Sequence, residues 1–203
     1  MKNRFKIALM AVSVAACAGS AYAIPLTLTL SDGIPADTQT IVDGLPGDLN
    51  LNPGVVTYIG PVGLNWFVNV TTGISEKPTA FMDLNSVDQS LGAGHLTITL
   101  TDGPFLQNGA VLAGIGGTTA GMVSYTTTFT GPIGGGPGPF AGSTTGAAVG
   151  APYNLTQTVD IFHRGAGVSS FDATIGVPDG GLTVALLGFA VMGVEGLRRR
   201  LSK

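Results

Sequence analysis

The sequence is poor in the residues that disulfide, metal and nucleophile chemistry use. Its 203 residues include one cysteine, Cys17, and a single cysteine cannot form a disulfide within the chain, so a disulfide-stabilised scaffold is excluded. The two histidines, His95 and His163, show no zinc-ligand spacing. We interpret both as structural or surface residues. The Gly-x-Ser-x-Gly spacing of a nucleophile elbow is also absent.

Positive charge is almost missing from the middle of the chain. Residues 24–176 contain ten acidic residues but only two basic ones, Lys77 and Arg164, and carry a formal charge of −8. A nucleic-acid binder needs a basic face to offset the phosphate charge, so that class is excluded. We expect Lys77 and Arg164 each to pair with a carboxylate at the surface, where an ion pair contributes little to stability.

Glutamate is scarce in the same region. Glu76 is the only one between residues 24 and 176, and it lies in a polar Ser-Glu-Lys-Pro segment. The paired carboxylates of a glycoside hydrolase cannot be recognised from sequence alone, but no other pattern points to a reaction. We therefore predict that the protein is not an enzyme, with a secreted hydrolase as an alternative.

Residues 1–23 have the pattern of a secretory signal peptide. Three basic residues among the first six precede a short apolar stretch, which predicts a brief signal helix. Ala21 and Ala23 fit the small-residue positions of a cleavage site. We expect signal peptidase to cut after Ala23, so that the mature chain begins at Ile24.

Two alternatives remain for this segment. It could stay uncleaved as a membrane anchor, although its apolar run is short for a span. The run Val14-Ala15-Ala16-Cys17 also matches a bacterial lipobox, in which Cys17 would be lipidated.

Residues 177–203 divide into three parts. An apolar run at 182–197 predicts a transmembrane helix of about 24 Å, slightly shorter than a bilayer core of about 30 Å. A basic tail follows at 198–203, and by the positive-inside rule it belongs on the cytoplasmic side. The short motif before the helix is Val177-Pro178-Asp179-Gly180-Gly181, and the basic anchor is Arg198, Arg199 and Arg200.

This three-part tail resembles the sorting signal of the PEP-CTERM family of bacterial proteins, in which a Val-Pro-Glu-Pro-like motif precedes an apolar helix and an arginine cluster. It looks like the VPDSG-type variant, with Gly180 where that variant has serine. The resemblance implies recognition by an exosortase, a membrane transpeptidase-like cysteine enzyme, which cleaves near the motif. It also implies that the protein is anchored in the inner membrane before processing and then reaches the cell surface or the exterior.

Between the two ends, apolar and polar residues alternate with a period of two. This alternation places one face of each strand in a core and the other in water, as in antiparallel sheets. We predict an all-β domain at residues 24–176, an antiparallel β-sandwich for which a jelly-roll-like order is one arrangement. The alternation is clearest at 26–31, 66–71, 96–101, 123–130 and 158–161.

Two segments of this domain are nearly identical. Residues 26–33 and 96–103 both read as an alternating strand followed by Asp-Gly, a dipeptide typical of turns. They are either equivalent strands of the sandwich, or similar strand-and-turn sequences that arose independently. Residues 131–152, rich in glycine and proline, are predicted to be a long exposed loop.

A candidate metal site lies in an acidic segment with glycine and proline. Ca²⁺ prefers carboxylate and carbonyl oxygens on a flexible loop, and Asp43, Asp48 and Asn50 have suggestive spacing. The segment is not an EF-hand, because no glutamate follows at the required offset. The competing interpretation is that these residues only form turns.

The function predicted from these features is that of an exported, exosortase-sorted protein of the cell envelope or extracellular matrix. Its domain would be structural or associated with exopolysaccharide. A carbohydrate- or calcium-binding module is the alternative, and it would need exposed aromatic side chains. The candidates for such a surface are Trp66, Phe67, Tyr125 and Tyr153, with Trp66 more typical of a core.

Overall fold

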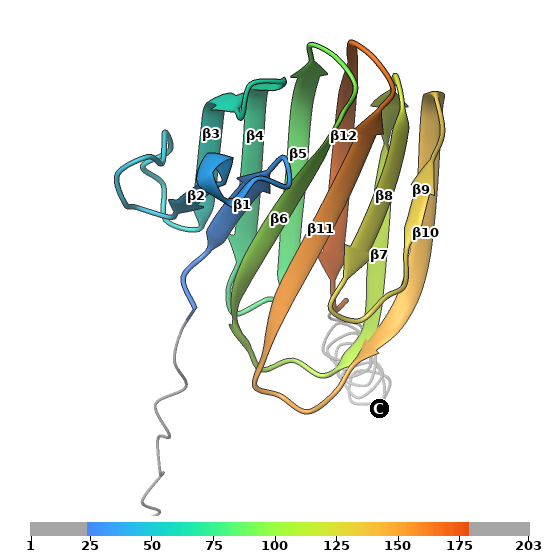
Figure 1. Ribbon diagram of the computed structural model, residues 1–203. Coiled ribbons are helices and arrows are strands. Elements are labelled where there is room, and N and C mark those ends of the chain that lie inside the picture. Colours follow the sequence, from blue (N-terminus) through green and yellow to red (C-terminus); the bar gives the residue numbers. More distant parts are fainter. Residues whose placement is uncertain (1–23, 179–203) are drawn as a thin grey trace, which may run out of the picture.

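The computed structural model describes residues 24–178, which form two six-stranded antiparallel sheets packed against each other (Figure 1). Apart from one short 3-10 turn, η1 (Pro35–Asp37), the regular structure of these residues is all strand, so the predicted all-β antiparallel fold is confirmed. Residues 24–178 include no helix with the length and hydrophobicity of a bilayer span. The helices predicted in 1–23 and at 182–197 lie outside the described residues.

The first sheet has the strand order β2-β1-β6-β11-β8-β9, and the second has the order β10-β7-β12-β5-β4-β3. The strands of the first sheet are β1 (Thr27–Ser31), β2 (Gln39–Val42), β6 (Gly94–Phe105), β8 (Met122–Thr127), β9 (Ile133–Gly135) and β11 (Tyr153–His163). Those of the second are β3 (Val55–Val62), β4 (Trp66–Glu76), β5 (Phe81–Ser90), β7 (Gly109–Thr119), β10 (Gly138–Ala148) and β12 (Gly167–Gly176). A jelly roll has eight strands, whereas residues 24–178 form twelve.

The core lies between the two sheets and is built from the inward side of the alternating pattern. In β6, for example, Leu96, Ile98 and Leu100 are fully buried, while the threonines between them face outward. Those outward threonines meet threonines of β11 across the ladder, as in the pair Thr99 and Thr158, whose hydroxyls are 3.3 Å apart. Burial of the apolar side holds the two sheets together.

The two near-identical segments lie side by side. β1 pairs with β6 antiparallel, with Leu28 opposite Leu100 and Leu30 opposite Ile98. The first Asp-Gly does form a turn, in which Gly33 has a φ of +92°. The second turn prediction is wrong, because β6 continues to Phe105 and carries its Asp-Gly within the strand.

The predicted loop at 131–152 is also wrong. This segment contains β9 and β10, and β10 pairs along its whole length with β7, from Gly138 opposite Thr119 to Ala148 opposite Gly109. The physical reason is the position of β10 at the edge of its sheet, where glycine and proline are tolerated. Composition therefore overstated the irregularity of this segment.

The described chain begins and finishes at the same end of the sandwich (Figure 1). We call this the tail end, and its loops are 77–80, 106–108 and 149–152. We call the opposite end the far end, where the turns at 63–65, 91–93, 120–121 and 164–166 lie. The candidate sites below belong to one end or the other.

Candidate functional site

The first residue of the predicted sorting motif is part of the folded domain. Val177 follows β12 directly, is 5% exposed and belongs to the core cluster. Its backbone N–H donates a hydrogen bond to the Ala80 carbonyl, at 2.9 Å. Gly109 packs so closely that a Cβ there would lie 3.1 Å from Val177 Cγ1. The next residue, Pro178, is exposed, so the accessible chain begins at Pro178.

The rest of the motif and the basic anchor lie outside the described residues: Asp179, Gly180, Gly181, Arg198, Arg199 and Arg200. The predicted cleavage positions Ala21 and Ala23 also lie outside them, whereas Ile24 is described and half-buried. A groove of about 400 Å³ runs beside Val177 and Pro178 and has Phe81 and Leu112 among its lining side chains.

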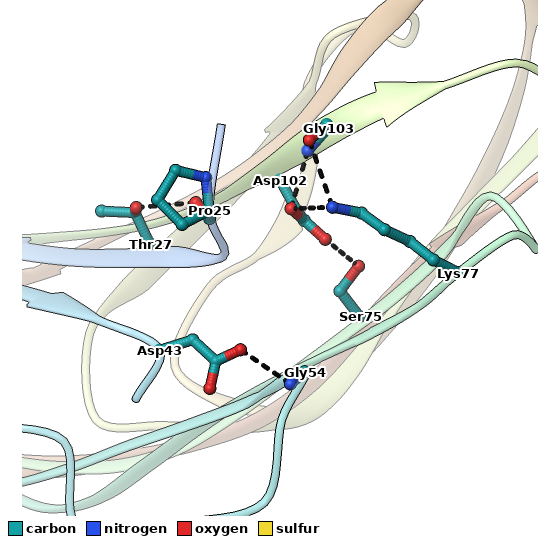
Figure 2. A network of polar contacts seen from close by, with 8 residues as sticks. All are labelled: Pro25, Thr27, Asp43, Gly54, Ser75, Lys77, Asp102 and Gly103. Carbon is teal, nitrogen blue, oxygen red and sulfur yellow. Dashed lines mark hydrogen bonds and ion pairs between the residues drawn. The ribbon is translucent and has the colours of Figure 1, made fainter. Parts of the chain in front are cut away.

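A polar network lies beside this groove at the tail end (Figure 2). Its centre is Asp102, a buried carboxylate on β6. Asp102 accepts a hydrogen bond from Ser75 Oγ at 2.5 Å and from Lys77 Nζ at 2.7 Å. Its own neighbour also donates, since Gly103 N lies 2.8 Å from Asp102 Oδ1. The pair predicted for Lys77 therefore exists, but its partner is buried rather than at the surface.

Lys77 completes the network in two further ways. Its ammonium donates to the Gly103 carbonyl at 3.1 Å and lies 5.8 Å from the centre of the Phe105 ring, within cation–π range. Because Ser75 lies on β4 of the second sheet, Lys77 directly follows β4, and Asp102 lies on β6 of the first sheet, the network ties the sheets together. Ser75 donates its hydrogen bond to a carboxylate that is already paired with the Lys77 ammonium.

Of the candidate calcium ligands, Asp43 lines a pocket together with Ser75, Lys77 and Asp102. The side-chain oxygens of all three candidates accept backbone hydrogen bonds. Asp43 Oδ2 accepts from Gly54 N at 2.7 Å, and Asn50 Oδ1 accepts from Asn52 N at 3.0 Å. Asp48 accepts three such bonds, from Gly44 N, Asn50 N and Thr57 N, at 2.9 to 3.1 Å. In residues 24–178 no three His, Cys, Asp or Glu side chains gather as a metal site. The bonds are those of turn-forming residues, and calcium binding stays a prediction.

A second polar cluster, at the far end, has a histidine at its centre. His163 is buried, with Nδ1 2.6 Å from Ser90 Oγ and Nε2 2.8 Å from Ser169 Oγ. Ser90 donates to the Gly165 carbonyl at 3.1 Å, so it accepts from Nδ1–H, which leaves Nε2 to accept from Ser169. In this assignment the imidazole is neutral. Burial lowers the pKa of His163, which also favours the neutral form.

Asp88 is the other titratable group buried near this end. It lies on the inward side of β5, where Ser86 Oγ donates to its Oδ1 at 2.7 Å. Its Oδ2 has no hydrogen-bond partner among residues 24–178. Burial raises the pKa of Asp88 to about 7, and the bond from Ser86 opposes this rise. Sequence analysis missed Asp88, although the alternation of β5 places it in register with the buried Met82 and Leu84.

The two histidines lie on adjacent strands but do not converge. His95 on β6 is opposite Phe162 of β11, on the outer face, where its Nε2 lies 3.1 Å from Asp160 Oδ1. His163 faces the core instead. They therefore form no shared site, in agreement with their interpretation as structural or surface residues.

Two carboxylates interact on the outer face of the second sheet. Asp83 of β5 and Asp172 of β12 interact through a hydrogen bond. Burial and the repulsion from Asp172 raise the pKa of Asp83 to about 6. In a glycosidase the two carboxyl groups stand about 5 Å or more apart, on either side of the bond that breaks. A pair that shares a hydrogen bond has a different geometry.

The aromatic candidates for a carbohydrate surface do not gather on one face. Trp66 and Tyr125 are buried, as expected for Trp66, and Tyr153 packs against Phe105 and Phe129. Phe67 is exposed. The Tyr125 hydroxyl lies 3.0 Å from both Gln157 Oε1 and the Thr174 carbonyl. These side chains are mainly core or core-edge residues.

Comparison with known proteins agrees with the sequence of the tail. Residues 176–201 match the family model of the VPDSG-CTERM motif, which is a variant of the PEP-CTERM type of sorting signal. The match begins at the last residue of β12. No curated protein matches the chain significantly.

Proposed function

We propose that this chain, which carries a VPDSG-CTERM sorting signal at residues 176–201, is an exosortase-sorted surface protein whose domain is structural or exopolysaccharide-associated and non-enzymatic. The observation that carries the proposal is the signal itself, which follows β12 without a linker. Support for a non-enzymatic role comes from the tail-end network, where the polar groups of Asp102, Ser75 and Lys77 are bonded to one another.

The fold also makes the second residue of the motif more accessible to a processing enzyme than the first. Val177 is buried and hydrogen-bonded to Ala80, whereas Pro178 is exposed. A protease that reads an extended peptide reaches Pro178 and the residues after it without opening the sandwich. We therefore expect cleavage on the C-terminal side of Pro178, so that the mature chain ends within 178–181 and retains Val177.

The test is intact-mass spectrometry of the protein from cells with and without an exosortase. The expected mature chain starts at Ile24 and ends within 178–181, and without the enzyme the tail is retained. Replacing Arg198, Arg199 and Arg200 with alanine is expected to block processing, while Arg164→Ala, a loss of positive charge at the far end, leaves it intact. A retained tail in exosortase-positive cells would refute the sorting proposal.

Calcium binding is the second candidate, favoured by the proximity of two carboxylates in one loop. Gly44 N contacts Asp48, and Gly54 N contacts Asp43, so the loop folds around both side chains. Thermal unfolding with and without millimolar Ca²⁺ tests this role. The expected shift is lost in Asp43→Ala with Asp48→Ala and kept in Asp83→Asn. An unchanged melting temperature in the wild type would remove the candidate.

A further inference from the structure

The chain length between the sandwich and the predicted transmembrane helix is very short. The described chain ends at Pro178, and the apolar run begins at Leu182. Four fully extended residues reach at most about 14 Å. The headgroup layer on one side of a bilayer is about 5 to 8 Å thick. Before cleavage, the tail end is therefore held at the headgroup layer.

Two loops of the tail end reach beyond the point where β12 ends (Figure 1). Each carries an exposed apolar side chain, Leu106 at 71% and Val149 at 70% exposure. The loops are bonded to each other, since Ala151 N donates to Asn108 Oδ1 at 3.3 Å. The tail end therefore presents two apolar side chains on one braced pair of loops.

These loops are also free of charge in an otherwise acidic domain. Neither 104–110 nor 147–153 contains a charged residue, although residues 24–176 carry −8. An anionic membrane surface repels acidic groups, so membrane-facing loops without them avoid that repulsion. The two loops combine low charge with apolar exposure where the tail brings the bilayer closest.

We propose that the loops 106–108 and 149–152 are a lipid-contacting surface, and that Leu106 and Val149 enter the boundary between headgroups and acyl chains while the tail is uncleaved. This proposal rests on the proposed function, in which the uncleaved tail holds the protein in the membrane. Binding at this depth grows with the apolar area buried, and two side chains bury little. Cleavage therefore releases the domain, because the loops alone are too weak an anchor.

The far end provides a matched comparison. Leu64 is 97% exposed, Leu91 is also exposed, and their turns are joined by the bond from Leu91 N to the Asn65 carbonyl, at 2.8 Å. Exposed apolar turns are thus present at both ends. Only the tail end is expected to meet lipid, because the tail leaves from there.

Depth-dependent fluorescence quenching tests the proposal. In a Cys17→Ser background, Leu106→Cys, Val149→Cys, Leu64→Cys and Leu91→Cys each give a single site for an environment-sensitive dye. The unprocessed chain is reconstituted into phosphatidylcholine vesicles that contain lipids with a quencher just below the headgroup. We expect dyes at 106 and 149 to lose about half of their fluorescence or more, and dyes at 64 and 91 to be unaffected.

The outcomes separate the two proposals. A chain that floats with the vesicles but shows no quenching at 106 and 149, or equal quenching at all four sites, overturns the lipid contact and leaves the sorting function standing. A chain that fails to float has no membrane tail, and both proposals then fail. Processed protein is expected not to float, and flotation without the tail would overturn the claim of release.

Charge is tested by replacing a third of the phosphatidylcholine with phosphatidylglycerol. Because the two loops contain no basic residue, quenching at 106 and 149 is expected to stay the same. A rise in quenching with phosphatidylglycerol at all four sites would indicate nonspecific adsorption instead, and would overturn the proposal.

Discussion

Both ends of the sandwich contain buried polar groups, but the hydrogen bonds that these groups make differ between the two ends. At the tail end, Asp102 accepts hydrogen bonds from Ser75, Lys77 and the Gly103 amide. Towards the far end, Asp88 accepts a hydrogen bond from Ser86, and its second oxygen has no partner within the described part of the chain. A buried charge is stable only when it is paired and hydrogen-bonded. The tail end therefore surrounds its buried carboxylate with donors, whereas at the far end burial raises the pKa of Asp88.

The largest expected effect is the pH dependence caused by Asp88. Its pKa is raised to about 7 in the folded protein, so the folded state binds a proton more tightly than the unfolded state. Stability falls as pH rises from about 4 to 7, by at most about 4 kcal/mol. Asp88→Asn is expected to remove most of this fall, as measured by urea unfolding at pH 5 and pH 8.

Asp83 is the control for this prediction, because its raised pKa acts in the same direction from the outer face. Asp83→Asn is expected to remove a smaller part of the fall. If Asp88→Asn and the wild type lose the same stability between pH 5 and pH 8, the far end is not the pH-sensitive one.

The second expected effect is the loss of the tail-end network in Asp102→Ala. This variant leaves Lys77 and Ser75 without their shared partner, and breaking a buried ion pair costs about 3 to 5 kcal/mol. Lys77 is 44% exposed and can turn to water, so we expect about 2 kcal/mol. Urea unfolding at pH 7 measures the loss.

Lys77→Met is the matched control for Asp102→Ala. Asp102 keeps the donors Ser75 and Gly103 N in this variant, so a smaller loss is expected. A loss for Asp102→Ala within the error of the measurement would show that the network adds nothing to stability.

The third expected effect concerns the boundary between the folded domain and the sorting signal. Val177→Ala removes two buried methyl groups, and we expect a loss of about 1 to 2 kcal/mol. Pro178→Ala, at the exposed neighbour, is expected to leave stability unchanged and to alter processing only. Unfolding measurements and intact-mass spectrometry on the same two variants check both expectations. Equal stability of the two variants would place Val177 outside the core.

The smallest effect is expected at the exposed loops of both ends. Leu106→Ser and Leu64→Ser should each change stability by no more than about 0.5 kcal/mol. They are expected to differ only when vesicles are present, where Leu106→Ser weakens the contact. A large loss in solution for either variant would show that its side chain packs against the protein.

The sequence predicted the all-β architecture more readily than it predicted which strands pair with each other. The alternation at Leu96, Ile98 and Leu100 predicted an inward face because burial needs only a period of two. It did not predict that β6 lies between β1 and β11, since the paired residues are 48 to 74 positions apart in the sequence. Pairing depends on contacts that no local pattern records.

The candidate sites show the same limit. The sorting motif was recognised because its information is local, whereas Asp102 was assigned to a turn. Its real role depends on Lys77 and Ser75, which the fold brings from another sheet. The loop predicted at 131–152 failed for a related reason. Glycine and proline signal irregular chain locally, but an edge strand accommodates them once a partner such as β7 is present.

The proline in that edge strand affects how β10 can pair with a strand of a second molecule. Pro139 of β10 has no backbone N–H, and open strand edges are where chains add to one another and grow into fibrils. The edge at β10 therefore offers an incomplete ladder to a strand of a second molecule. At high local density on a surface, a missing donor weakens the addition of a second molecule's strand at this edge.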